Sequence, residues 1–224
     1  MPKTEEIIDD HIQLTRRYFV GIGTAAVTGV ALSSVSADTP PELADAIGDL
    51  EYLTADADFV NCSRGNPSPP MLSPEEHRAA GMHRDTWRLE VIADPDTDAK
   101  IENPLSEELG TALTWNDLME LAEERAACYL HIVTCLNVSD PCGMGLWEGV
   151  PLRDVVWLAK PKANIRRVFY NGFHNNDPDQ IFRSSLPFGR VLEDPPGQLP
   201  VMLCYKLNGE YLSPDRGGPV RVFV

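Results

Sequence analysis

The hydrophobic and polar positions of this chain predict short strands interleaved with a few helices. Alternation over residues 87–92 predicts a strand, and Asp94-Pro95-Asp96 supplies the turn that ends it. The apolar, β-branched run over residues 129–135 predicts a buried strand. Three more strands are expected at residues 167–171, 199–207 and 220–224.

Helix signals are fewer. Thr114 is a suitable N-cap because Asp117 follows three residues later and Leu118, Leu121 and Ala122 continue an apolar face. A second helix is expected at residues 152–158, entered from a turn at Gly149-Val150-Pro151, and a short one at residues 42–53. Prolines make residues 59–74 a loop. The mixture predicts a single domain of the α+β class.

The length and composition of the chain are typical of a protein with one globular core. The chain has 224 residues, of which 43% are hydrophobic, and its 19 prolines and 16 glycines favour many turns. No internal repeat or low-complexity tract interrupts it. We expect the domain to occupy residues 38–224.

The first 37 residues have the pattern of an export signal. Arg16-Arg17-Tyr18-Phe19 is a twin-arginine pattern, the uncharged apolar run 20–32 follows, and Val35-Ser36-Ala37 supplies small residues. The run is shorter than the roughly 18–20 residues that span a bilayer, so no integral membrane span is expected in the mature chain. The alternative is an amphipathic helix with a chance arginine pair. The pattern predicts a periplasmic or other extracytoplasmic protein, and this route carries folded proteins that often hold a cofactor.

The net charge of the chain limits the classes of binding partner. The net charge is −15, and it is −14 without residues 1–37, which carry three basic and four acidic residues. Such a surface repels nucleic acid and anionic membranes, so neither is expected as a partner; strong acidity also fits a salt-adapted surface. An anionic substrate or cofactor therefore needs a local cluster of arginines. The candidates are Arg64, Arg166, Arg167, Arg183, Arg190, Arg216 and Arg221.

Cysteine spacing gives one candidate site. The five cysteines (62, 128, 135, 142 and 204) contain no Cys-x-x-Cys and no zinc pattern, and their odd number leaves one unpaired in a monomer. Cys135 ends a predicted strand, where a thiolate could bind a soft transition metal. The alternative is that Cys135 is a small hydrophobic side chain buried in the core. Without Cys-x-x-Cys-His or paired histidines, no haem is expected.

Several motifs follow one another along residues 52–224. They are Phe59-Val60 to Arg64-Gly65-Asn66-Pro67, Trp115-Asn116-Asp117-Leu118-Met119, Cys135, Trp147-Glu148-Gly149-Val150-Pro151-Leu152-Arg153-Asp154-Val155, Ser185-Leu186-Pro187, Asn208-Gly209, Leu212, Asp215, Gly217, Pro219 and Arg221. Together, and in this order, they resemble the motifs of the sulfite-oxidase-like molybdopterin-dependent oxidoreductases.

The resemblance implies a molybdopterin-binding domain with a molybdenum–molybdopterin cofactor. Cys135 would be the metal ligand, and Arg64, Asn66, Arg216 and Arg221 would contact the cofactor. Arg183 would attract an oxyanion at the active-site mouth. The implied reaction is oxygen-atom or two-electron transfer on a sulfite-like oxyanion or a sulfoxide, with a separate electron carrier.

Departures from the family pattern keep alternatives open. Arg64 is followed by Gly65-Asn66 where the family commonly has Asn-His, Arg216 stands at a usual histidine, and the residues after Cys135 lack the arginine that typical sulfite oxidases place near the substrate. The family continues beyond the position of Val224 with a lysine-bearing segment, so a C-terminally truncated domain is expected. The alternatives are a methionine-sulfoxide repair reductase of the same family, a truncated domain that binds no cofactor, and an exported domain stapled by disulfides such as Cys128–Cys142 or Cys62–Cys204.

Overall fold

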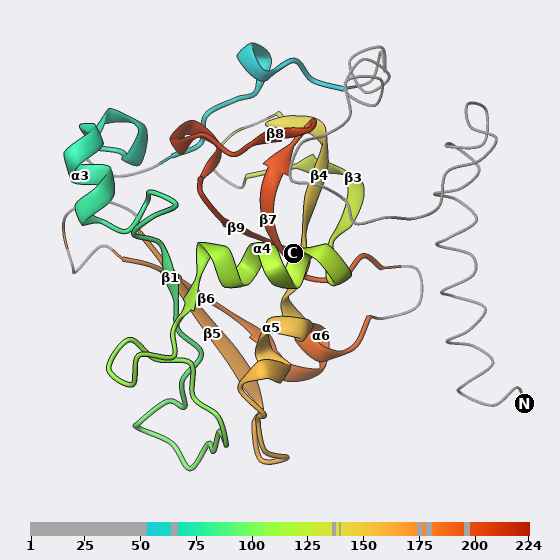
Figure 1. Cartoon of the computed structure of the whole chain (residues 1–224). Coiled ribbons are helices and arrows are strands. Elements are labelled where there is room, and N and C mark those ends of the chain that lie inside the picture. Colours follow the sequence, from blue (N-terminus) through green and yellow to red (C-terminus); the bar gives the residue numbers. More distant parts are fainter. Residues whose placement is uncertain are drawn as a thin grey trace, which may run out of the picture. The chain divides into compact units, whose positions relative to one another are not determined.

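An antiparallel sheet of five strands is the centre of the computed structural model, which describes residues 53–63, 67–135, 138, 140–173, 177, 181–194 and 198–224. β3, β4 and β7 lie side by side, and β7 also pairs with β8 near one end and with β9 near the other (Figure 1). The strands are β3 (Ala127–Val133), β4 (Gly143–Pro151), β7 (Met202–Leu207), β8 (Glu210–Tyr211) and β9 (Arg221–Phe223). The α+β class is confirmed.

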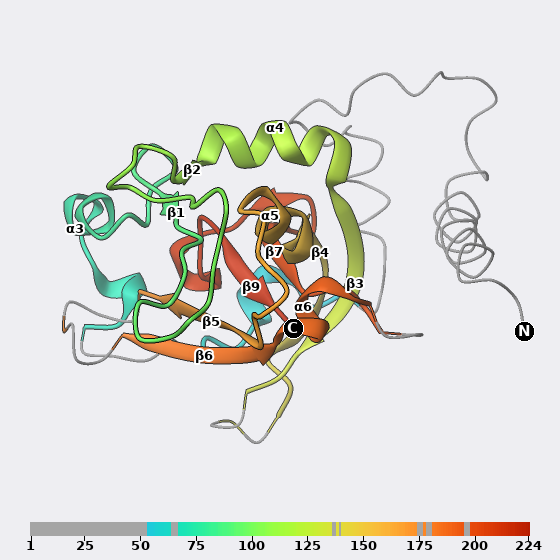
Figure 2. The ribbon, with the colours of Figure 1, turned by 90° about the horizontal axis from the view of Figure 1, so that it is seen from below.

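Helix α4 (Trp115–Arg125) packs across the central sheet (Figures 1 and 2). Its predicted cap is confirmed, because the Asp117 backbone N–H donates to Thr114 Oγ1 at 3.2 Å and the Thr114 N–H donates to the Asp117 carboxylate at 2.8 Å. The Thr114 hydroxyl also donates to the Asp117 carboxylate, at 2.6 Å, and the hydrogen bonds from this hydroxyl and from the Thr114 N–H lower the pKa of Asp117. Leu118 is fully buried and fixes which face of α4 meets the sheet.

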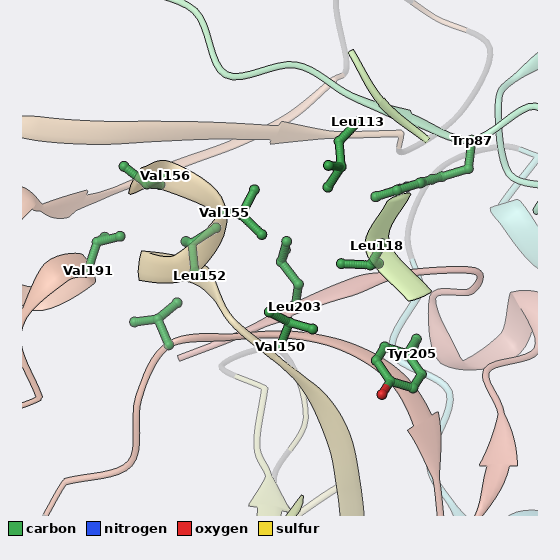
Figure 3. Packing of buried hydrophobic residues seen from close by; sticks show 11 residues of the cluster. Trp87, Leu113, Leu118, Val150, Leu152, Val155, Val156, Val191, Leu203 and Tyr205 are labelled. Carbon is green, nitrogen blue, oxygen red and sulfur yellow. The ribbon is translucent and has the colours of Figure 1, made fainter. Parts of the chain in front are cut away.

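A second antiparallel pair, β5 (Arg167–Gly172) and β6 (Phe182–Pro187), extends the core away from the central sheet. Helices α5 (Leu152–Leu158) and α6 (Phe188–Leu192) pack between the two sheets. Val155, Val156 and Val191 of these helices belong to the same buried cluster as Val150 of β4 and Leu203 of β7 (Figure 3). Burial of these side chains holds the layers together.

Shorter elements complete the described fold. They are α3 (Pro74–Ala79), β1 (Arg88–Leu89), β2 (Leu113–Thr114) and the 3-10 turns η1 (Asp56–Asp58), η2 (Pro69–Met71) and η4 (Pro214–Arg216). Within the described ranges, no helix has the length and apolar character needed to cross a membrane. The helix expected at residues 42–53 and the leader at residues 1–37 lie outside those ranges, apart from residue 53.

One prediction about β4 was wrong, and β6 had no counterpart among the predicted strands. Gly149-Val150-Pro151 is not a turn: these residues end β4 and pair with Cys204, Leu203 and Met202, after a bulge at Glu148/Gly149. The glycine is needed for close packing, since an added Cβ would lie 2.3 Å from the Leu203 carbonyl oxygen. The segment Phe182–Pro187 was not predicted as a strand, because its polar centre hides the alternation that pairing with β5 creates.

Candidate functional site

Cys135 lies two residues beyond β3. It packs at the edge of a buried hydrophobic cluster that includes Phe59, Cys142 and Trp147. It is half-buried, and its carbonyl accepts a hydrogen bond from the Val138 N–H at 3.2 Å. Cys62 and Cys142 come near it from other parts of the chain. We call Cys62, Cys135 and Cys142 the thiol cluster.

Burial sets the electrostatics of the thiol cluster. It raises the pKa of Cys142, and the neighbouring Cys62 and Cys135 raise that pKa further. Arg221 acts on the same pKa in the opposite direction, so a guanidinium lies within electrostatic range of Cys142. The cluster thus combines soft donor atoms for a metal with a nearby positive charge that favours a thiolate, whereas burial opposes the charged form.

The motif Asn208-Gly209 forms the hairpin turn between β7 and β8. Both residues have positive φ, 51° and 85°, as a tight hairpin requires. The Asn208 side chain also accepts a hydrogen bond from the Leu146 N–H at 2.8 Å and donates to the Thr54 carbonyl at 3.4 Å. This residue therefore ties the turn to β4 and to the segment before η1.

Arg216 and Arg221 lie on the continuation of this turn. Arg216 is largely buried: its side chain is 11% exposed, and its Nε donates to the Asp56 carboxylate at 3.0 Å. A second guanidinium nitrogen donates to the Asp56 carbonyl, and the Phe59 ring lies 5.3 Å from the guanidinium carbon. Arg221 donates to the Arg216 carbonyl at 3.4 Å. Arg216 thus stabilises the fold by holding Asp56. Contact of Arg216 or Arg221 with a cofactor stays a prediction.

The remaining sequence candidates lie elsewhere. Arg183 is exposed on β6, opposite Asn171, in a different sheet from the strand that leads to Cys135. Its role toward an oxyanion stays a prediction. Arg64 and Asn66 lie outside the described residues.

Sequence reasoning missed a basic cavity beside the turn. A cavity of about 560 Å³ lies between α3, the residues after it and the 212–219 turn. Its cationic and titratable lining comprises His77, Arg78, His83 and Arg84, with one carboxylate, Asp85. Arg78 donates to Asp85 at 3.1 Å and lies 3.3 Å from His83 Nε2. The clustering of His77, Arg78, His83 and Arg84 within eight residues was the available signal.

Other parts of the motifs build the fold. Trp147 is 2% exposed and lies between Phe59 and Phe223, with ring centroids at 6.5 and 4.3 Å. Glu148 pairs with the buried Lys206 at 3.4 Å. Burial also raises the pKa of both Cys128 and Cys204 to about 12. These two thiols stay protonated and inert at neutral pH.

The described residues fit a molybdopterin in chemical type. Cys135 offers one soft donor, and the basic cavity offers charges for an anionic group. The buried Trp147 Nε1 has no hydrogen-bond acceptor among the described residues. No group of three or more His, Cys, Asp or Glu side chains in this part of the chain is arranged to hold a metal by itself.

Comparison with known proteins gives partial matches to much longer enzymes. The chain is 34% identical over 86 residues to the NADPH nitrate reductase of Fusarium oxysporum, covering 38% of this chain and 9% of that protein. It is 33% identical over 92 residues to the NADH nitrate reductase of Volvox carteri, covering 38% and 10%. The matches thus span about a tenth of these relatives' length.

One solved structure is similar in outline. It is the sulfane dehydrogenase SoxCD from Paracoccus pantotrophus, with a TM-score of 0.48 and 18% identity, covering 89% of this chain and 52% of that chain. The family model of the oxidoreductase molybdopterin binding domain matches residues 77–224, more than half of the chain. The range includes β3, Cys135, the basic residues of the cavity and the turn that carries Arg216 and Arg221. The chain therefore belongs to the family of molybdopterin-binding oxidoreductase domains.

Proposed function

We propose that this chain is an exported molybdenum-dependent oxidoreductase that transfers an oxygen atom, with two electrons, to or from a small oxyanion or sulfoxide. The observation that carries the proposal is the position of Cys135: a half-buried thiol directly after β3, in a cluster that Arg221 approaches, within a molybdopterin-binding domain. A bound molybdopterin would supply the redox-active metal.

Each group has a separate task in this proposal. Cys135 provides the protein ligand, and burial beside Phe59 and Val133 limits water around it. Arg221 favours the thiolate form of a nearby cysteine and draws anions toward this end of the fold. The cavity lined by Arg78 and Arg84 suits a phosphate group, because guanidinium binds phosphate with paired hydrogen bonds.

The substrate is proposed from charge and from relatives. Arg221, which acts on Cys142 of the thiol cluster, favours an anion over a cation at this place on a chain of net charge −15. Nitrate is a candidate because matched relatives are named nitrate reductases, and sulfite is a candidate from the motif resemblance. In either case a separate carrier exchanges two electrons with the protein. Export is proposed from Arg16-Arg17 and the apolar run after them.

A substrate panel tests this proposal. The protein is purified from a molybdate-supplied host and assayed for sulfite oxidation with an artificial electron acceptor, and for nitrate and methionine-sulfoxide reduction with a reduced dye. We expect turnover of at least one oxyanion, and loss of that activity in Cys135→Ser. The matched control is Cys128→Ser, a buried thiol on β3 whose pKa of about 12 keeps it inert. Turnover of the sulfoxide alone would favour the repair reductase, and no turnover by metal-loaded protein would contradict the proposal.

A further inference from the structure

The thiols of Cys62 and Cys142 are in direct contact. Their side chains are hydrogen-bonded to each other, and both belong to the buried cluster around Phe59 and Trp147. The two residues are 80 positions apart in the sequence. The fold alone therefore brings these sulfurs together.

Backbone contacts fix the two segments that carry the thiols. The Val60 N–H donates to the Cys142 carbonyl at 2.8 Å, and the Cys142 N–H donates to the Val133 carbonyl at 2.8 Å. The Phe59 ring fills the space beside Gly143, where an added Cβ would lie 2.4 Å from the ring. The segment before Cys62 is thus held against the start of β4, so the contact between the thiols does not depend on a loosely placed side chain.

The other cysteines differ in position. Cys135 lies within electrostatic range of Cys142, whereas Cys128 pairs with Glu148 in the β3–β4 register and Cys204 with Gly149 in the β4–β7 register. Cys128 lies at the opposite end of β3 from Val133, which holds Cys142. The Cα atoms of two cysteines joined by a disulfide lie less than about 7 Å apart. Because Cys128 and Cys142 lie at opposite ends of β3, a disulfide between them is excluded. A side-chain hydrogen bond joins Cys62 to Cys142, whereas the effect of Cys135 on the pKa of Cys142 is electrostatic.

We propose that Cys62 and Cys142 form a disulfide when the protein is oxidised, and that this bond leaves Cys135 as the thiol of the cluster. Each of the two thiols loses a proton, and their two electrons reduce an external disulfide, such as oxidised glutathione, to two thiols. The reaction is ordinary thiol–disulfide exchange through a mixed disulfide. The role of Cys135 as a metal ligand rests on the proposed function, whereas the disulfide between Cys62 and Cys142 does not.

The bond would have two consequences. It would anchor the segment Phe59–Cys62, which leads into Arg64, to the start of β4. It would also prevent a Cys135–Cys142 bond, which would consume the proposed metal ligand. An export route into an oxidising compartment would make such protection useful.

Peptide mapping of the full chain tests the proposal. The purified protein is oxidised with oxidised glutathione, remaining thiols are alkylated, and the chain is cut with trypsin and an Asp-specific protease. These cuts separate Cys62 (peptide 58–64), Cys142 (peptide 140–153) and Cys135 from one another. We expect peptides 58–64 and 140–153 to be linked and Cys135 to be alkylated. Recovery of Cys62 and Cys142 as alkylated thiols, or a Cys135–Cys142 link, would overturn the proposal.

Thermal unfolding gives a second readout. A disulfide closing a loop of about 80 residues raises the Tm of the oxidised over the reduced protein by roughly 5–15 °C. Cys62→Ser should abolish this redox-dependent difference, and Cys128→Ser should retain it. A linked protein that lacks molybdenum would contradict the proposed function alone, whereas a metal-loaded protein without the link would contradict this inference alone.

Discussion

Arg216 shows that a side chain assigned to a ligand by its motif can also stabilise the fold. The motif places it at a position where the resembled family usually has a histidine. In the structure its guanidinium holds Asp56 by the carboxylate and the carbonyl, and it lies over Phe59. Because Phe59 also supports Cys62 and Gly143, Arg216 contributes to the position of the thiol cluster even without contacting a ligand.

We therefore expect Arg216→Met to lower the free energy of unfolding by about 1–2 kcal/mol, since it removes charge-assisted hydrogen bonds that are partly solvent-screened at Asp56. Urea unfolding followed by tryptophan fluorescence measures the change. The control is Arg183→Met, an exposed position that should change stability by less than about 0.5 kcal/mol. Equal stabilities of the two variants would argue against the Asp56 contact.

At the scale of elements, β4 is the strand on which the site depends. It lies between β3 and β7, its start is held against Cys62 and its bulged end leads directly into α5. The bulge brings Gly149 against the backbone of Leu203 and Cys204, with a hypothetical Cβ at 2.3 and 2.7 Å from them. Backbone atoms cannot move aside as a flexible side chain can.

Gly149→Ala should therefore destabilise the protein by roughly 2–3 kcal/mol or more, because the added methyl group forces β4 and β7 apart. Gly172→Ala on β5 is a matched control: nothing lies within 4 Å of its added Cβ, so a change below about 1 kcal/mol is expected. Thermal or urea unfolding compares the two. If Gly149→Ala proved as stable as Gly172→Ala, the close approach of the two strands would be refuted.

The elements that depend on contacts between residues close in the sequence were predicted best. The cap at Thr114 and the boundaries of α5 follow from contacts within a few residues, and both agree with the structure. The turn signal at Gly149 misled because close packing between strands, rather than backbone reversal, requires that glycine. Strand β6 was missed because its own pattern is polar, although its partner β5 is the strand that directly precedes it in the sequence.

At the scale of the whole molecule, the candidate site is assembled from segments far apart in the chain. Sequence alone could identify Cys135 and the turn with Arg221, since each lies in a motif. It could not identify the contact of Cys62 with Cys142, which exists only in the folded chain, and the basic residues at positions 77–84 indicate a charged segment without showing that it faces the 212–219 turn. The disulfide pairs considered from sequence did not include the pair in contact.

The most direct test of the account is the molybdenum and pterin content of the full chain, purified from a molybdate-supplied host. Elemental mass spectrometry and pterin fluorescence should give close to one metal and one pterin per chain in the wild type and in Cys128→Ser. Cys135→Ser should remain folded and lose most of the molybdenum. Folded wild-type protein without molybdenum, or a Cys135→Ser variant that keeps it fully and in the same electronic environment, would contradict the role proposed for Cys135.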